Sequence, residues 1–164
     1  MNASTKRLRD LLLTATCVLT ILAPGHASAA NAPNVRATIE NIIEKLVTDM
    51  NKGDLKAVVA ACAPRASIVD GFPPYAWQTC AGWMHDYEAN NKAIQGTLGT
   101  LSTGKPMYTE AMGQHAYIIY PVTFTDKQKG KSVIYKGSWT ITLWKTQGRW
   151  LITGAAGAWS WNNL

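Results

Sequence analysis

The chain has 164 residues, of which 47% are hydrophobic and 16% charged, and its formal net charge is +6. A disordered protein would need fewer hydrophobic and more charged residues, and no repeat of the length that builds solenoids or propellers is present. The length suits one domain with a single core.

The first 29 residues are predicted to be a secretory signal. Three basic residues precede residues 11–22, an apolar run shorter than the about 20 residues that a membrane span needs. Ala27-Ser28-Ala29 matches an A-x-A cleavage pattern, so we expect cleavage after Ala29. The mature protein is then a single domain, residues 30–164, that is periplasmic or secreted and has no membrane segment.

Cleavage removes three basic residues and one acidic residue, which lowers the net charge from +6 to +4. The remaining bases are scattered, apart from Lys127, Lys129 and Lys131, which we expect at a hairpin tip. A nucleic-acid-binding face needs a stripe of bases. We therefore predict no nucleic-acid partner.

Two helices are predicted at the start of the mature chain. Within residues 35–50, apolar residues recur every three or four positions, as on one face of an amphipathic helix. Gly53 suits the left-handed position that ends such a helix, and Asp54 suits the N-cap of the next. We expect the second helix to place Cys62 on its apolar face and to stop at Pro64.

A short strand, a loop and a third helix are expected next. Residues 66–70 are typical of a strand, whereas the two prolines within residues 71–75 exclude ladder pairing there. Thr79 is a suitable N-cap for a helix that runs to about Ile94 with Trp83 on one side.

The second half is predicted to be an antiparallel meander, because its segments are rich in strand-forming residues and separated by turns. Residues 96–104 are expected to form a loop or a weak strand. The expected strands are residues 107–112, 115–125, 132–146 and 149–161. Three helices followed by a curved sheet give an α+β domain in which the helices cover one sheet face.

Cys62 and Cys80 are the two cysteines of the mature chain. An exported protein meets an oxidising compartment, so these residues are candidates for a disulfide. The alternative is a pair of buried free thiols.

Two segments carry patterns that occur together in one superfamily. Residues 51–55 (Asn-Lys-Gly-Asp-Leu) and 60–70 are similar to a helix end, a short helix and an "Ala-…-Val-x-Asp" entry into a strand. Residues 148–152 are similar to a final "Gly-x-Trp-x-Ile" hairpin. In these motifs and in element order the chain resembles the nuclear transport factor 2-like superfamily, with its SnoaL-like and ketosteroid-isomerase-like domains.

The resemblance implies a cone-shaped α+β barrel: a curved antiparallel sheet, covered by about three N-terminal helices, that encloses a pocket. It also implies a homodimer built through the outer sheet face. The superfamily includes isomerases, dehydratases, hydrolases and non-catalytic binding modules, so the fold alone does not select a function.

Asp70 falls where the ketosteroid-isomerase-like members carry their carboxylate base. Such a base needs an apolar surround that raises its pKa, and Phe72 and Tyr75 follow closely. The alternative is that Asp70 caps the turn after it. Tyr75 or His115 is the candidate catalytic partner of Asp70.

The isomerase pattern is incomplete in this chain. At the two positions where those enzymes carry oxyanion donors, counting along the motifs gives Leu46, which cannot donate a hydrogen bond, and Thr140, which is a weaker neutral donor. Since such donors contribute much of the transition-state stabilisation in those enzymes, steroid-type isomerisation is not expected.

Aromatic residues are the remaining indication of a pocket, because seven Trp and six Tyr exceed what a small core uses. Core and interface packing is the alternative. Strand alternation leaves open whether Trp139 or Thr140 faces inward. The predicted pocket-lining residues are Trp83, Tyr87, Tyr117 and Thr140.

His85 and Glu88 share a helix face, but one pair does not make a metal site. We predict no metal and no cofactor. The sequence leaves three hypotheses: an exported domain that binds a small apolar or aromatic molecule, an isomerase, dehydratase or hydrolase with Asp70 as general base, or a dimeric interaction module.

Overall fold

The computed structural model describes residues 32–161, and the predicted signal sequence lies outside this range. The helices are α1 (Ala32–Asn51), α2 (Leu55–Ala60) and α3 (Cys80–Ala93). The strands are β1 (Cys62–Val69), β2 (Ala76–Trp77), β3 (Thr100–Thr103), β4 (Tyr108–Met112), β5 (His115–Gln128), β6 (Lys131–Thr146) and β7 (Arg149–Trp161). No helix within the described range combines the length and hydropathy of a membrane-spanning segment.

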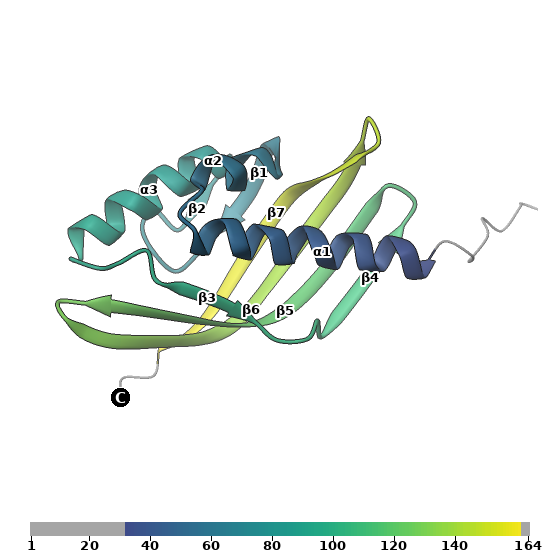
Figure 1. Cartoon of the computed structure of the whole chain (residues 1–164). Coiled ribbons are helices and arrows are strands. Elements are labelled where there is room, and N and C mark those ends of the chain that lie inside the picture. The colour runs from purple at the N-terminus through teal and green to yellow at the C-terminus, as the bar shows by residue number, and fades with distance from the viewer. Residues whose placement is uncertain (1–31, 162–164) are drawn as a thin grey trace, which may run out of the picture.

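The strands form one curved sheet in the order β2-β1-β7-β6-β5-β3, and β4 also pairs with β5. Figure 1 shows the three helices on one side of this sheet, with α1 lying across it. The expected α+β class with a helix-covered curved sheet is confirmed. The sheet is mixed rather than wholly antiparallel, because β1 pairs in parallel with β7.

The amphipathic pattern of α1 explains its position. Ile39, Ile43 and Leu46 are buried and belong to the core, whereas the opposite face is exposed. Gly53 has a φ of 70°, as predicted for the residue that ends the helix. The Asp54 side chain accepts a hydrogen bond from the Ala57 N–H, which is the predicted N-cap of α2.

The boundary between α2 and β1 differs from the prediction. The helix ends at Ala60, and Cys62 and Pro64 belong to β1. Pro64 is tolerated because β1 registers with β7 at Cys62 and again only from Ser67. The proline therefore lies in a stretch where no ladder hydrogen bond is required of it.

Strict alternation along β5 and β6 decides which side chains face the helices. On β6, Trp139, Ile141 and Leu143 are buried, and Trp139 is 3% exposed. Thr140 therefore points to the outer face of the sheet, which corrects the prediction that it lines the pocket. The hairpin between β5 and β6 turns at Lys129 and Gly130, both at positive φ, so the predicted three-lysine tip is confirmed.

Candidate functional site

A cavity of about 370 Å³ opens between α3, the loop after β1 and the helix-covered face of the sheet. Such a volume falls in the range of small-molecule pockets, which are mostly apolar with a few polar anchors. Eight aromatic side chains line the cavity: Phe72, Tyr75, Trp83, Tyr87, Phe124, Tyr135, Trp139 and Trp159.

Asp70 lies at the wall of the cavity, immediately after β1. Its Oδ1 atom accepts hydrogen bonds from Trp159 Nε1 and from the Gly71 N–H, each at 2.7 Å. Its Oδ2 atom accepts one from Trp83 Nε1 at 3.0 Å. The chain thus brings α3 and β7 together on one carboxyl group, which also accepts from the N–H of the residue that follows it, Gly71.

Burial raises the pKa of the Asp70 carboxyl above its ordinary value of 3.8, against the opposing effect of the hydrogen bonds from Trp159, Gly71 and Trp83. The three donors all favour the ionised form. Asp70 is consequently a desolvated carboxyl group whose oxygens accept from two indole N–H groups and one backbone N–H.

The absence of a side chain at Gly157 leaves room for the Trp159 indole to reach Asp70. A Cβ atom at Gly157 would lie 2.7 Å from Trp159 Nε1, 3.1 Å from Asp70 Oδ1 and 3.2 Å from Trp139 Nε1. Side chains larger than hydrogen would push these groups apart. Gly157 therefore makes room for the Asp70 anchor.

The predicted residues Tyr75, Trp83 and Tyr87 all line the cavity. Tyr75 is an exposed residue at a φ of 73°, so it lies at the cavity's edge. The hydroxyl of Tyr87 donates to the Leu98 carbonyl oxygen, and burial raises the pKa of Tyr87 to about 12. Tyr87 is therefore a neutral wall residue.

His115 and Tyr117 lie elsewhere. They alternate with the buried Ala116 and Ile118 on β5, so they face the opposite side of the sheet from the cavity. His115 stacks on Trp144 with ring centroids 5.2 Å apart. Neither residue can act on a molecule that occupies the cavity.

Asp126 is a cavity residue that the sequence reading missed. Its Oδ1 atom accepts hydrogen bonds from the Thr97 N–H at 2.9 Å, from Thr97 Oγ1 at 2.6 Å and from the Lys127 N–H at 2.6 Å. Asp126 continues the inward series of Val122 and Phe124, so the period-two pattern of β5 indicates its position once the inward face of the strand is known.

Asn91 lies on α3 one turn after Tyr87 and also lines the cavity. A hydrogen bond between the side chains of Asn91 and Tyr87 opposes the effect of burial on the Tyr87 pKa. Among residues 32–161, the Oδ2 atom of Asp126 is buried without a hydrogen-bond partner, which a ligand in the cavity could supply.

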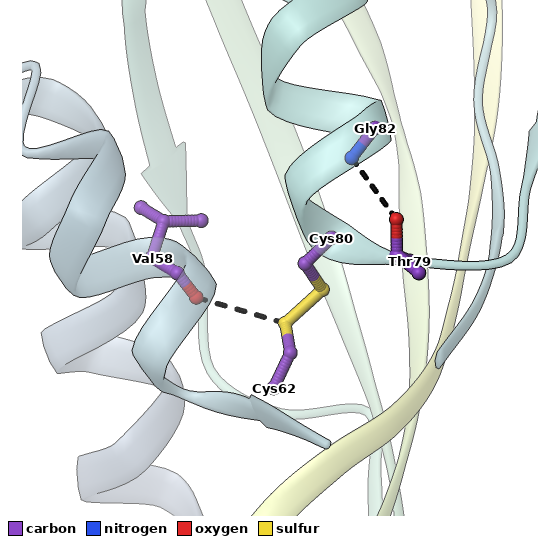
Figure 2. The surroundings of a disulfide bond; sticks show 5 residues. All are labelled: Val58, Cys62, Thr79, Cys80 and Gly82. Carbon is purple, nitrogen blue, oxygen red and sulfur yellow. Dashed lines mark hydrogen bonds between the residues drawn. A yellow bond between two sulfur atoms is a disulfide. The ribbon is translucent and has the colours of Figure 1, made fainter. Parts of the chain in front are cut away.

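The disulfide candidate is present: Cys62 and Cys80 are bonded, with Cα atoms 6.3 Å apart. Figure 2 shows that the bond joins the start of β1 to the first turn of α3, beside the Thr79 cap, whose Oγ1 accepts from the Gly82 N–H. Since α3 carries Trp83 and Tyr87, the bond fixes one wall of the cavity to the strand that leads to Asp70.

The histidine considered for metal binding makes a local contact instead. His85 Nδ1 lies 2.9 Å from Asp86 Oδ1, and Asp86 also accepts a hydrogen bond from Trp77 Nε1. Within the described part of the chain, no three His, Cys, Asp or Glu side chains gather closely enough to hold a metal ion.

Comparison with known proteins identifies the fold of this chain. No family model and no curated protein matches the chain. Among solved structures, hexachlorocyclohexane dehydrochlorinase LinA-type3 from Novosphingobium barchaimii is 14% identical, with a TM-score of 0.69 over 82% of this chain and 92% of that chain.

A putative scytalone dehydratase from Novosphingobium aromaticivorans is 11% identical, with a TM-score of 0.65 over 79% of this chain and 86% of that chain. An NTF-2 like protein of unknown function from Shewanella oneidensis is 17% identical, with a TM-score of 0.57 over 76% and 98%. At these identities the likeness concerns the fold, and the fold of this chain is that of the nuclear transport factor 2-like superfamily.

Proposed function

We propose that this chain is a binding domain for a small aromatic or largely apolar molecule, which occupies the cavity beside Asp70. The supporting observation is the cavity wall itself, in which eight aromatic rings surround about 370 Å³ and only a few polar side chains intervene. Rings of this kind bury a flat apolar ligand, while the polar side chains fix its orientation.

The state of Asp70 favours binding over catalysis. Two indoles and a backbone N–H already donate to its oxygens, which leaves the carboxylate less basic than burial alone would make it. The candidate partner His115 faces the other side of the sheet. Asp70 therefore serves to organise Trp83 and Trp159 as fixed walls.

A pair of variants on α3 tests the proposal. Asn90 lines the cavity, whereas its neighbour Ala89 is exposed and does not. We expect Asn90→Trp to fill the space and abolish binding of 1-naphthylmethanol measured by calorimetry, whereas Ala89→Trp should bind like the parent. Equal binding by both variants, with circular dichroism showing both folded, would remove the cavity as the site.

A second candidate function is an elimination reaction with Asp70 as general base. Two observations favour it: burial raises the Asp70 pKa, and two proteins of the same fold are described as a dehydratase and a dehydrochlorinase, whose reactions remove water or hydrogen chloride. The base would take a proton from carbon while the leaving group departs from the adjacent carbon.

Asp70→Asn alone is an unsuitable test of this elimination reaction. Both oxygens of Asp70 accept from indole N–H groups, so the new amide N–H₂ would face one of these donors and leave it without an acceptor. Trp83→Phe removes the conflicting donor. Chloride release from hexachlorocyclohexane by Trp83→Phe, lost in the double variant Trp83→Phe/Asp70→Asn, would support catalysis. No release by the parent protein would count against this elimination.

We propose further that the protein is a homodimer built through the outer sheet face. Tyr117 and Trp144 are large side chains that remain exposed there, and Trp144 is 50% exposed. Tyr108 packs edge-on against Tyr117 and widens this apolar area. Exposed apolar patches on a single subunit are typical of interfaces.

Export is the last part of the proposal. The predicted signal, residues 1–29, and a disulfide between Cys62 and Cys80 both fit an oxidising compartment. N-terminal sequencing of the protein recovered outside the cytoplasm should begin at Ala30. Recovery of the uncleaved chain from the cytoplasm with reduced cysteines would contradict export.

A further inference from the structure

The charges that line the cavity are all of one sign. Asp70 and Asp126 are acidic, and no Lys, Arg or His of residues 32–161 belongs to the lining. The chain as a whole is basic, with a formal net charge of +6. The acidic lining is therefore a local property of the cavity rather than a reflection of overall composition.

Asp126 uses one carboxyl oxygen within the protein and leaves the other without a partner. Three hydrogen-bond donors converge on Oδ1. Its Oδ2 atom has no hydrogen-bond partner in the described part of the chain, although the residue is only 2% exposed. A buried carboxylate oxygen without a partner is costly, and a charged donor compensates it most strongly.

The rings around the cavity suit the same kind of group. The negative face of an aromatic ring attracts a cation within about 6 Å, and Trp is the most effective ring. Trp83, Trp139 and Trp159 all line the cavity, with the Trp83 and Trp139 centroids 6.1 Å apart. The wall can therefore hold a positively charged group as well as an apolar body.

Asn91 is compatible with a cationic ligand in the cavity. The residue is 7% exposed and lines the cavity. Turning about the Cβ–Cγ bond presents either the amide nitrogen or the amide oxygen, so the residue adapts to an ammonium or to a hydroxyl group.

We propose that the cavity selects an organic cation: an aromatic or apolar body carrying a protonated amine, which donates to Asp126 Oδ2 and lies against the indole rings. This inference rests on the proposed function, since it names the class of ligand for the same cavity. An anionic ligand would face two carboxylates with no basic side chain of the described lining to receive it. A neutral alcohol would also donate to Asp126 Oδ2, but through a weaker hydrogen bond than a positively charged amine makes.

The test compares three ligands with the same ring system, namely 1-naphthylmethylamine, 1-naphthylmethanol and 1-naphthoate, by calorimetry at pH 7. We expect the amine to bind about tenfold more tightly than the alcohol, since a charged hydrogen bond is about twice as strong as a neutral one and 1.4 kcal/mol is a factor of ten. Binding of 1-naphthoate should not be detectable.

Asp126→Asn is the decisive variant, because its Oδ1 atom can keep all three hydrogen bonds while the charge is removed. The tenfold preference for the amine should disappear, with the affinity for the alcohol unchanged within about twofold. Glu88→Gln is the matched control, since it removes one negative charge from an exposed position of α3 that does not line the cavity. It should leave the preference intact.

The outcomes separate the two proposals. Equal binding of amine and alcohol by the parent, or tighter binding of 1-naphthoate, overturns the cation inference and leaves the aromatic binding site standing. A preference that persists in Asp126→Asn overturns the role of Asp126. Absence of binding by all three ligands overturns the proposed binding function itself. If Asp126→Asn does not fold, the affinities of the parent protein for the three ligands still decide whether the cavity prefers a cation.

Discussion

Reduction of the Cys62–Cys80 disulfide should destabilise the domain by an amount that follows from its position. The bond spans a sequence separation of 18 residues, and in the chain-entropy model a loop of that size restricts the unfolded chain by about 3 kcal/mol. Both cysteines are buried, so the reduced thiols stay packed and the native state loses little else.

The expected change is large enough to measure. For a domain of about 130 residues, 3 kcal/mol corresponds to a fall in Tm of about 10 °C. Urea unfolding with and without reductant should give the same difference in the free energy of unfolding. The variant Cys62→Ala/Cys80→Ala is the control, because reductant should leave its stability unchanged.

A loss of less than about 1 kcal/mol on reduction would refute the entropic reasoning. Since α3 forms one wall of the cavity, reduction should also weaken binding of 1-naphthylmethanol, because the first turn of α3 is no longer tied to β1. Unchanged binding would show that packing alone holds α3 in place.

Three further predictions follow from other contacts. Burial raises the Asp70 pKa above 3.8, so between 3.8 and the raised pKa the folded protein keeps a proton that the unfolded chain loses. The free energy of unfolding, measured with urea, should therefore fall as the pH rises through this window. The double variant Trp83→Phe/Asp70→Asn should not show this pH dependence. Asn51 makes two hydrogen bonds of 2.8 Å with the backbone of Leu101, so Asn51→Ala should lower the free energy of unfolding in urea by about 1–2 kcal/mol. The control variant Asn34→Ala, at an exposed site of α1, should lower it by less than about 0.5 kcal/mol. Trp144→Lys should convert the proposed dimer to a monomer in analytical ultracentrifugation, and a parent that sediments as a monomer would contradict the dimer.

Short-range rules recovered most of the local structure. The apolar spacing of α1, the caps at Asp54 and Thr79 and the left-handed Gly53 depend on residues within one or two turns of each other. The parallel pairing of β1 with β7 depends on segments at opposite ends of the domain, so no local pattern indicates it.

The candidate site was predictable where it is close to Asp70 in the sequence. Tyr75, Trp83 and Tyr87 reach the cavity through the loop and helix that follow β1. His115 was misplaced because β5 carries large apolar or aromatic side chains on both faces, which leaves the inward direction undetermined.

Asp126 was overlooked for a different reason. A charged residue near a hairpin tip is normally solvated, whereas here the Thr97 contacts and the Lys127 N–H allow its burial. Those partners come from a loop 29 residues earlier in the chain and from the strand itself, so only the three-dimensional structure brings them together.

Intermolecular nuclear Overhauser effects test the central claim most directly, because they report which side chains touch a bound aromatic molecule. With 1-naphthylmethanol bound, the account predicts effects from the naphthalene protons to the indole protons of Trp139 and to the ring of Tyr87. Effects to Trp144 and His115 on the opposite sheet face, without any to Trp139, would contradict it.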